Sequence, residues 1–151
     1  MVGGALIAQN RKARHDYEVV ANYEAGIVLT GSEIKAVREH RVQLVGAFAR
    51  MRNGELWLED MHIAAYLNAG YSGHAPTRTR KLLLHKKEIG KIAQLMGEQA
   101  LTMIPLSMYL KNGKAKVELG LCRGLKRYDK RARIAERDVE RDVARAVRRD
   151  V

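Results

Sequence analysis

Four side chains of a kind used in acid–base or metal chemistry stand out: Glu24, His40, Asp60 and His62. Carboxylates and imidazoles that meet in space can hold a divalent cation, as a metal nuclease requires. Their spacing matches no such motif, because the sequence has no His-Glu-x-x-His pair, paired-cysteine set or Walker loop. We therefore expect no catalysis, no cofactor and no metal, and a metal nuclease stays only a third hypothesis.

Basic side chains indicate a different chemistry, the binding of a polyanion. The chain has 28 Lys and Arg residues against 17 Asp and Glu residues, a formal net charge of +11. Nucleic acids and anionic membranes both attract such a charge. A membrane surface, however, usually binds a basic helix that carries large apolar residues on its other face.

The first cluster of cations precedes the first expected strand. Its arginines and lysine can engage phosphates, while its amide and imidazole can hydrogen-bond or stack on RNA. An ordinary basic N-terminus would have the same composition, so that alternative stays open. The cluster consists of Asn10, Arg11, Lys12, Arg14 and His15.

A second basic cluster spans a loop, a strand and a helix start. Leu82, Leu83 and Leu84 lie within this cluster, and leucines are more often core than contact residues. Because successive strand residues face opposite sides, Leu83 is expected to face away from its two neighbours, so that one leucine is exposed. Lys35 and Arg38 add cations on a short helix, beside its apolar face. The second cluster comprises Arg78, Arg80, Lys81, His85, Lys86 and Lys87.

Short strands joined by tight turns must position these clusters. Asn53-Gly54 and Asn112-Gly113 supply the positive-φ pairs that two-residue hairpins require. The pattern predicts a mainly β fold with helices: a small closed antiparallel OB-like barrel with flanking helices. The expected elements are strands at 16–20, 26–30, 42–52, 55–59, 101–104, 108–110 and 115–121, a connection at 22–25, a short helix capped by Ser32 and a helix at 86–97.

The rest of the composition favours a soluble cytoplasmic protein. No run approaches the roughly 18 apolar residues of a membrane span, and the first ten residues lack an export signal. The single cysteine, Cys122, is expected to be a small buried residue. We expect a monomer with no membrane partner.

The composition changes at Arg123, which divides the chain into a barrel at 1–122 and a basic tail at 123–151. The tail holds 11 basic and 6 acidic residues, and an arginine recurs every fourth position from Arg133 and Arg137 onward. Its small aliphatic residues suit neither a membrane anchor nor a stable isolated helix, so we expect it to become helical on binding. A merely solvated helix is the alternative.

Five sequence blocks in order, at 7–17, 23–35, 76–85, 116–121 and 128–131, resemble the SmpB family. The resemblance covers nearly the entire chain. It implies an OB-like barrel that holds the tRNA-like domain of transfer-messenger RNA (tmRNA) and carries it to stalled ribosomes for trans-translation. It also implies that the tail enters the decoding centre and the mRNA channel, beside small-subunit rRNA. A general ribosome-associated OB-fold protein is the runner-up hypothesis.

By the same resemblance, Glu24, Leu83 and His85 match tmRNA-contact positions. As a carboxylate, Glu24 can accept a hydrogen bond from a base amino group or a 2′-hydroxyl, or orient an arginine; a solvated strand-end charge is the alternative. Leu125 replaces a usual cation, and Arg127 is expected to compensate. The residues expected to contact the ribosome are Gly124, Lys126, Arg127, Tyr128, Asp129, Lys130, Arg131, Arg133 and Arg137.

Overall fold

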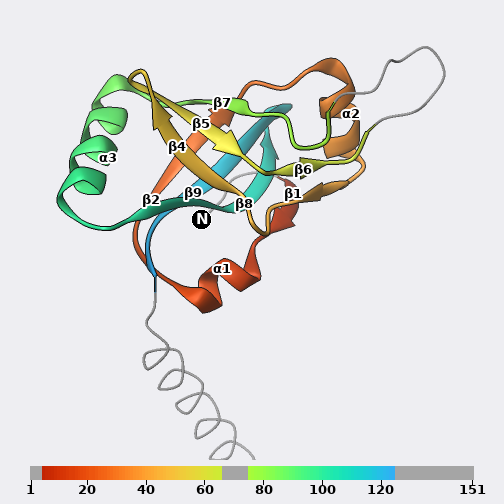
Figure 1. The fold of residues 1–151 in the computed structure, drawn as a ribbon. Coiled ribbons are helices and arrows are strands. Elements are labelled where there is room, and N and C mark those ends of the chain that lie inside the picture. The colour runs from red at the N-terminus through yellow and green to blue at the C-terminus, as the bar shows by residue number, and fades with distance from the viewer. Residues whose placement is uncertain (1–4, 66–74, 125–151) are drawn as a thin grey trace, which may run out of the picture.

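The computed structural model describes residues 5–65 and 75–124 of the chain, which form a mainly β structure with a few helices (Figure 1). The predicted fold class is confirmed at this level. The elements are β1 (Ala5–Gln9), α1 (Arg11–Asp16), β2 (Tyr17–Ile27), α2 (Gly31–Arg38), β3 (Val42–Gln43), β4 (Phe48–Arg52), β5 (Glu55–Glu59), β6 (His62–Ile63), β7 (Arg80–Leu83), α3 (Lys86–Glu98), β8 (Thr102–Lys111) and β9 (Lys114–Gly124).

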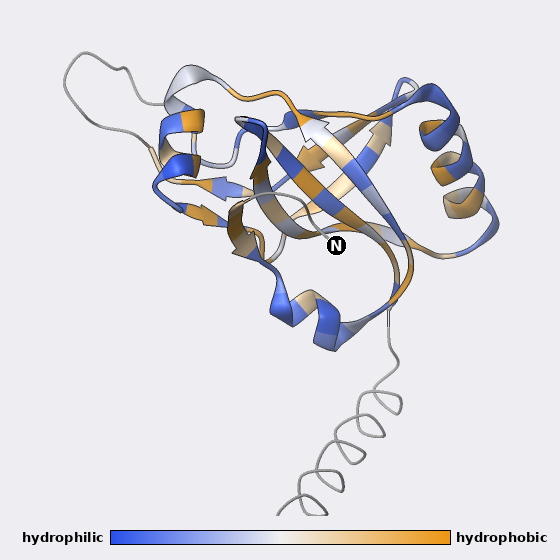
Figure 2. Ribbon diagram, turned by 180° about the vertical axis from the view of Figure 1, so that it is seen from behind, coloured by the Kyte–Doolittle hydropathy of each residue, from blue (hydrophilic) through white to orange (hydrophobic). Residues whose placement is uncertain are grey.

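Seven strands form one antiparallel sheet in the order β1-β8-β4-β5-β7-β2-β9, and β9 also pairs with β8. The pairings therefore run in a cycle from β8 through β4, β5, β7, β2 and β9 back to β8. Strands β3 and β6 form a separate two-stranded sheet. Hydrophobic and hydrophilic residues alternate along the strands (Figure 2), and the inward set, including Leu56, Leu58, Leu82 and Met103, is buried.

Both predicted Asn-Gly hairpins are confirmed. Asn53 and Gly54 have φ angles of 52° and 75°, and Asn112 and Gly113 have 52° and 76°. Positive φ at both central residues matches the right-handed twist of the flanking strands. The first turn joins β4 to β5 and the second joins β8 to β9.

Strand β2 corrects the predicted break at 22–25. It runs unbroken over Tyr17–Ile27 because β9 pairs with it along nearly its whole length, with Glu24 opposite Glu118 and Gly26 opposite Lys116. A polar stretch that suggested a turn is instead held by a long partner strand. The expected strand at 26–30 correspondingly ends at Ile27, and Thr30 begins the next helix.

Other boundaries shift for local reasons. The first basic cluster folds as α1, because the Asn10 side chain accepts a hydrogen bond from Ala13 N and caps the helix. Thr30, not Ser32, caps α2. The expected strand at 42–52 divides into β3 and β4. Strand β8 continues through Pro105, where a register shift accommodates the missing N–H group.

A buried carboxylate joins α2 to β7. Glu33 has no exposed surface, and it forms a capping box with Thr30 at the start of α2. Arg80, also fully buried, donates to Glu33 Oε2, and Arg78 Nη2 donates to Glu33 Oε1 at 2.6 Å. Arg80 additionally donates to the backbone oxygens of Met61 at 2.7 Å and Pro76 at 3.1 Å. One guanidinium thus ties three segments to the helix.

Burial alone would raise the pKa of Glu33. Hydrogen bonds from Arg78, the Thr30 backbone and Arg80, together with the charge of Arg80, outweigh that cost and lower the pKa to about 2. The folded protein therefore keeps this carboxylate ionised well below the pH at which an unfolded glutamate would be protonated.

We expect the protein to lose stability as the pH falls from about 4.5 toward about 2, because protonation of Glu33 then favours the unfolded chain. The contribution is fully present above the unfolded pKa, and a shift of this size corresponds to about 3 kcal/mol. Urea unfolding across this range measures it. Glu33→Gln should flatten this part of the pH profile and lower stability at neutral pH, and an unchanged slope in the variant would contradict the assignment.

Candidate nucleic-acid interface

An open pocket of about 480 Å³ lies where β2, β7, β9 and the start of α3 meet. It combines carboxylates, cations and exposed apolar surface. Its lining residues are Glu24, Gly26, Leu83, Leu84, His85, Glu88 and Lys116. Three of them, Glu24, Leu83 and His85, are the positions that the sequence resemblance assigned to RNA contact.

Strand register creates this pocket from distant parts of the sequence. Gly26 on β2 pairs with Leu83 on β7 and with Lys116 on β9. A β-carbon at Gly26 would lie 3.3 Å from Leu83 Cβ, tighter than ordinary contact. The absent side chain therefore lets Leu83 pack closely against β2.

Leu83 presents apolar surface to solvent, as alternation along the strand predicted. Its side chain is 51% exposed, whereas Leu82 beside it is 1% exposed. An exposed leucine on a rigid strand offers a face against which an unstacked base can pack. His85, two residues further along the chain, is exposed at the N-cap of α3. Its backbone N–H donates to Glu88 Oε1 at 3.2 Å.

Glu24 is the ionised group of the pocket. It accepts a hydrogen bond from the Tyr109 hydroxyl and lies 3.4 Å from Lys111 Nζ. The Tyr109 hydrogen bond above all lowers the pKa of Glu24, with further help from Lys111 and Lys116 against the opposing effect of burial. A charged carboxylate repels phosphate and accepts hydrogen bonds from base N–H groups and 2′-hydroxyls, which suits it to reading a nucleotide.

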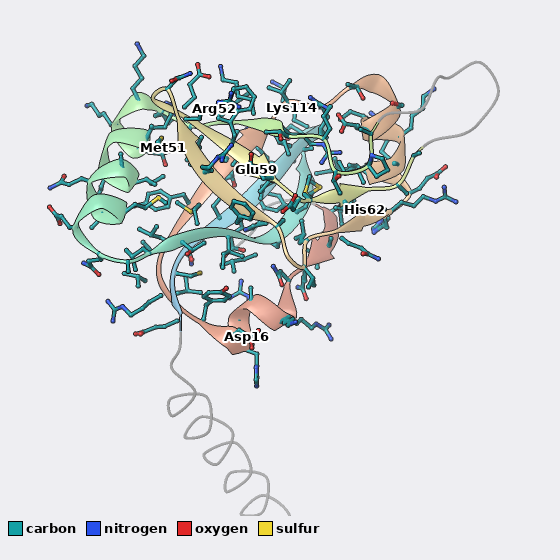
Figure 3. All side chains as sticks on the ribbon, viewed as in Figure 1. Asp16, Met51, Arg52, Glu59, His62 and Lys114 are labelled. Carbon is teal, nitrogen blue, oxygen red and sulfur yellow. The ribbon has the colours of Figure 1, made fainter. Side chains whose placement is uncertain are left out.

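The first basic cluster lies at the edge of the sheet where β9 ends. Arg11, Lys12 and Arg14 are exposed on α1, and Arg14 lies 3.5 Å from Glu118, the residue opposite Glu24. His15 contacts Asp16 at 3.1 Å. Figure 3 places Asp16, on α1, far from Arg52 at the end of β4. None of these three cations lines the pocket at Glu24, and Lys12 lines a separate hollow between α1 and β8.

Two residues expected to contact RNA have other roles in the structure. Asn10 is 2% exposed, and its amide donates to the backbone oxygens of Leu44 and Pro105 while its carbonyl caps α1. Arg80 has no exposed surface and binds Glu33. Both side chains are enclosed and hold neighbouring elements together, while their expected contact with RNA stays a prediction.

The other cations of the second basic cluster differ in their surroundings. Arg78 is partly exposed and bound to Glu33, and Lys81 lies 3.1 Å from Glu55, whereas Lys86 is exposed beside the pocket at the start of α3. Lys35 and Arg38 belong to α2, which lies at the opposite end of the sheet from α3 (Figure 1). These two are therefore not brought to the pocket.

Sequence reasoning missed four residues that line the pocket: Gly26, Leu84, Glu88 and Lys116. The alternation of Lys116 with buried Val117 indicates only that the lysine faces outward. Its partner across the strands depends on register, which the sequence alone does not fix.

The predicted tail begins where β9 ends. Arg123 still belongs to the strand and donates to Gln99 at 3.2 Å, and Gly124 pairs with Tyr17. The strand thus continues two residues past the predicted boundary at 122. The expected ribosome contacts from Lys126 to Arg137 lie outside the described residues.

Within residues 5–65 and 75–124, no group of three or more His, Cys, Asp or Glu side chains is arranged to hold a metal ion. The hypothesis of a metal nuclease thus gains no support from this part of the chain. In the same residues, no helix is long and apolar enough to cross a membrane. Cys122 is buried, as predicted, and burial raises the pKa of its thiol to about 11.

The fold and the pocket define a basic, mainly antiparallel β protein whose exposed groups suit a nucleic acid. A family model described as "SmpB protein" matches residues 7–149. The SsrA-binding protein of Thermobifida fusca (strain YX) is 52% identical over 147 residues, 97% of this chain and 92% of that protein. The SsrA-binding protein of Limosilactobacillus reuteri (strain DSM 20016) is 56% identical over 133 residues, 88% of this chain and 85% of that protein.

A solved structure described as "tmRNA-SmpB: a journey to the center of the bacterial ribosome" contains a similar chain, with a TM-score of 0.67 and 45% identity. The similarity covers 82% of this chain and 91% of that one. The chain belongs to the SmpB protein family.

We expect Leu83→Ala to weaken binding to tmRNA, the RNA named with the solved relative, by several-fold, since the smaller side chain buries less apolar surface against a base, a loss of about 1 kcal/mol. Filter binding measures this loss. Val20→Ala is the matched control, because Val20 is 44% exposed on β2 but outside the pocket. Equal affinities of the two variants would show that the pocket is not a contact site.

Proposed function

We propose that this protein binds the tRNA-like domain of tmRNA and delivers it to stalled ribosomes, where trans-translation rescues the ribosome and tags the nascent chain. The observation that carries the proposal is the convergence of Glu24, Leu83 and His85 in one exposed pocket. These three positions match RNA contacts of the family, and they come from three separate elements. Membership of the family supports the same partners, tmRNA and the ribosome.

The pocket's chemistry divides the work of binding. Glu24 would accept a hydrogen bond from a base or a 2′-hydroxyl, and Leu83 would pack against a base. Phosphates would be met by cations of the body, which fix position without reading sequence. Lys116 lines the pocket and Lys86 begins α3 beside it, whereas Arg11, Lys12 and Arg14 lie on α1. Asn10, Arg78 and Arg80 would contribute by holding α1, α2 and β7 in place.

The architecture proposed for this function is a closed OB-like barrel with a separate basic tail. The cycle of strand pairings from β8 to β9 and back supports closure. The body corresponds to 1–122 with the last two residues of β9 added, and the rest of 123–151 is the tail. We propose that the tail becomes helical in the decoding centre and mRNA channel, where its arginines follow rRNA phosphates.

The protein would act by binding alone. It needs no cofactor under this proposal, because tmRNA and the ribosome supply the chemistry of tagging. We further propose that it works in the cytoplasm as a monomer.

Competition binding tests this proposal against a general ribosome-associated OB-fold protein. With labelled tmRNA at about 150 mM salt, unlabelled tRNA should compete at least tenfold less well than unlabelled tmRNA. The preference should persist as salt rises, although each phosphate contact costs about 0.7 to 0.9 log units of affinity per decade of salt. Equal competition by bulk tRNA would favour the general RNA-binding protein.

A further inference from the structure

The geometry points to Tyr109 as the positioning residue that fixes the Glu24 carboxylate for RNA recognition. This inference rests on the proposed function of the pocket and adds to it a residue that lies outside the pocket lining. Tyr109 belongs to β8, whereas Glu24 belongs to β2, and β9 lies between these strands.

Tyr109 is anchored in the core and reaches an exposed group. Its side chain is only 1% exposed, and its Cα partner on β9 is Lys116, which in turn pairs with Gly26. The phenolic hydroxyl of Tyr109 reaches across β9 and donates a hydrogen bond to Glu24 Oε2. A ring with two rotatable bonds, fixed by burial, is a far stiffer support for a carboxylate than a surface lysine.

Glu24 needs such a support because a second carboxylate lies directly across the strands. Glu118 on β9 is its Cα partner, and like charges in this arrangement repel. Glu118 has its own donors, Ser107 Oγ at 3.0 Å and Arg14 Nη2 at 3.5 Å. Tyr109 and Lys111 serve Glu24 in the same way. Each carboxylate thus has a separate set of donors, which keeps the pair apart.

The hydrogen bond also settles which group carries the proton. Burial, and then the Glu24 carboxylate, raise the pKa of Tyr109, so its hydroxyl remains a donor. The same bond is the chief cause that lowers the pKa of Glu24. One oxygen of Glu24 is thereby occupied by Tyr109, and the other, 3.4 Å from Lys111, remains able to accept from an RNA N–H or O–H group.

Tyr109→Phe tests this role because it removes the hydroxyl and keeps the buried ring. We expect tmRNA affinity to fall about tenfold or more, in line with a lost hydrogen bond to a charged group. In a Glu24→Gln background the same substitution should cost little further affinity. Tyr23→Phe is the control, because the Tyr23 ring packs against the core from the strand that carries Glu24. It should bind like the wild type.

A measurement without RNA separates positioning from a general effect on folding. In Tyr109→Phe the carboxyl carbon of Glu24, followed by NMR, should titrate at higher pH than in the wild type, while that of Glu118 should move less. Two results would overturn the role of Tyr109. One is that the affinity losses of Tyr109→Phe and Glu24→Gln simply add when the two substitutions are combined, and the other is an unchanged Glu24 titration in Tyr109→Phe. Equal wild-type affinity for tmRNA and tRNA would instead overturn the proposed function, and the titration would still report on the Tyr109–Glu24 contact.

Discussion

The buried carboxylate of Glu33 is the constraint on which the arrangement of the pocket depends. It holds Arg80, the first residue of β7, and Arg78 just before it, while Arg78 also donates to the backbone oxygen of Val28 at 3.3 Å. Val28 directly follows β2. The network therefore fixes the start of β7 against the end of β2, three residues from where Leu83 meets Gly26. Breaking such a buried pair leaves an uncompensated charge, so the network makes this geometry obligatory for the folded chain.

Carboxylates organise this cationic protein at two levels. Glu33 works in the interior, where two arginines offset the cost of burying its charge. Glu24 and Glu118 work at the surface, each with its own donors, so that a negative group can stand in an otherwise positive interface. Under the proposed function, the positive charge would supply attraction to RNA, and the fixed acceptors would supply selectivity among its groups. Removing one carboxylate would therefore change recognition through the lost acceptor more than through the small change in net charge.

The sequence predicts best what local chemistry determines. Asn53-Gly54 and Asn112-Gly113 predicted both hairpins, the spacing of Ile89 and Ile92 predicted α3, and alternation predicted the exposure of Leu83. Long-range partners determine the rest. Residues 22–25 belong to a strand only because β9 pairs with them, and a sequence reader has no local signal for that. The RNA partner itself came from family resemblance.

Asn10 and Arg80 illustrate the same limit in the site. Both were expected at the RNA because polar and cationic side chains usually lie at the surface. Asn10 is buried because α1 requires a cap, and Arg80 is buried because Glu33 requires a counter-charge. Such partners are known only once strands and helices are placed. Conversely, Tyr109 looks like an ordinary core aromatic in the sequence, and its hydroxyl gains meaning only from Glu24 across β9.

The central claim is that the β-sheet body recognises tmRNA by itself, while the basic tail serves only at the ribosome. The most direct measurement compares the full chain with one that ends after Gly124, where β9 is complete. Both should bind tmRNA with affinities within a few-fold of each other, and only the full chain should support tagging on stalled ribosomes. Equal loss of tmRNA binding and tagging in the shortened chain would contradict the account.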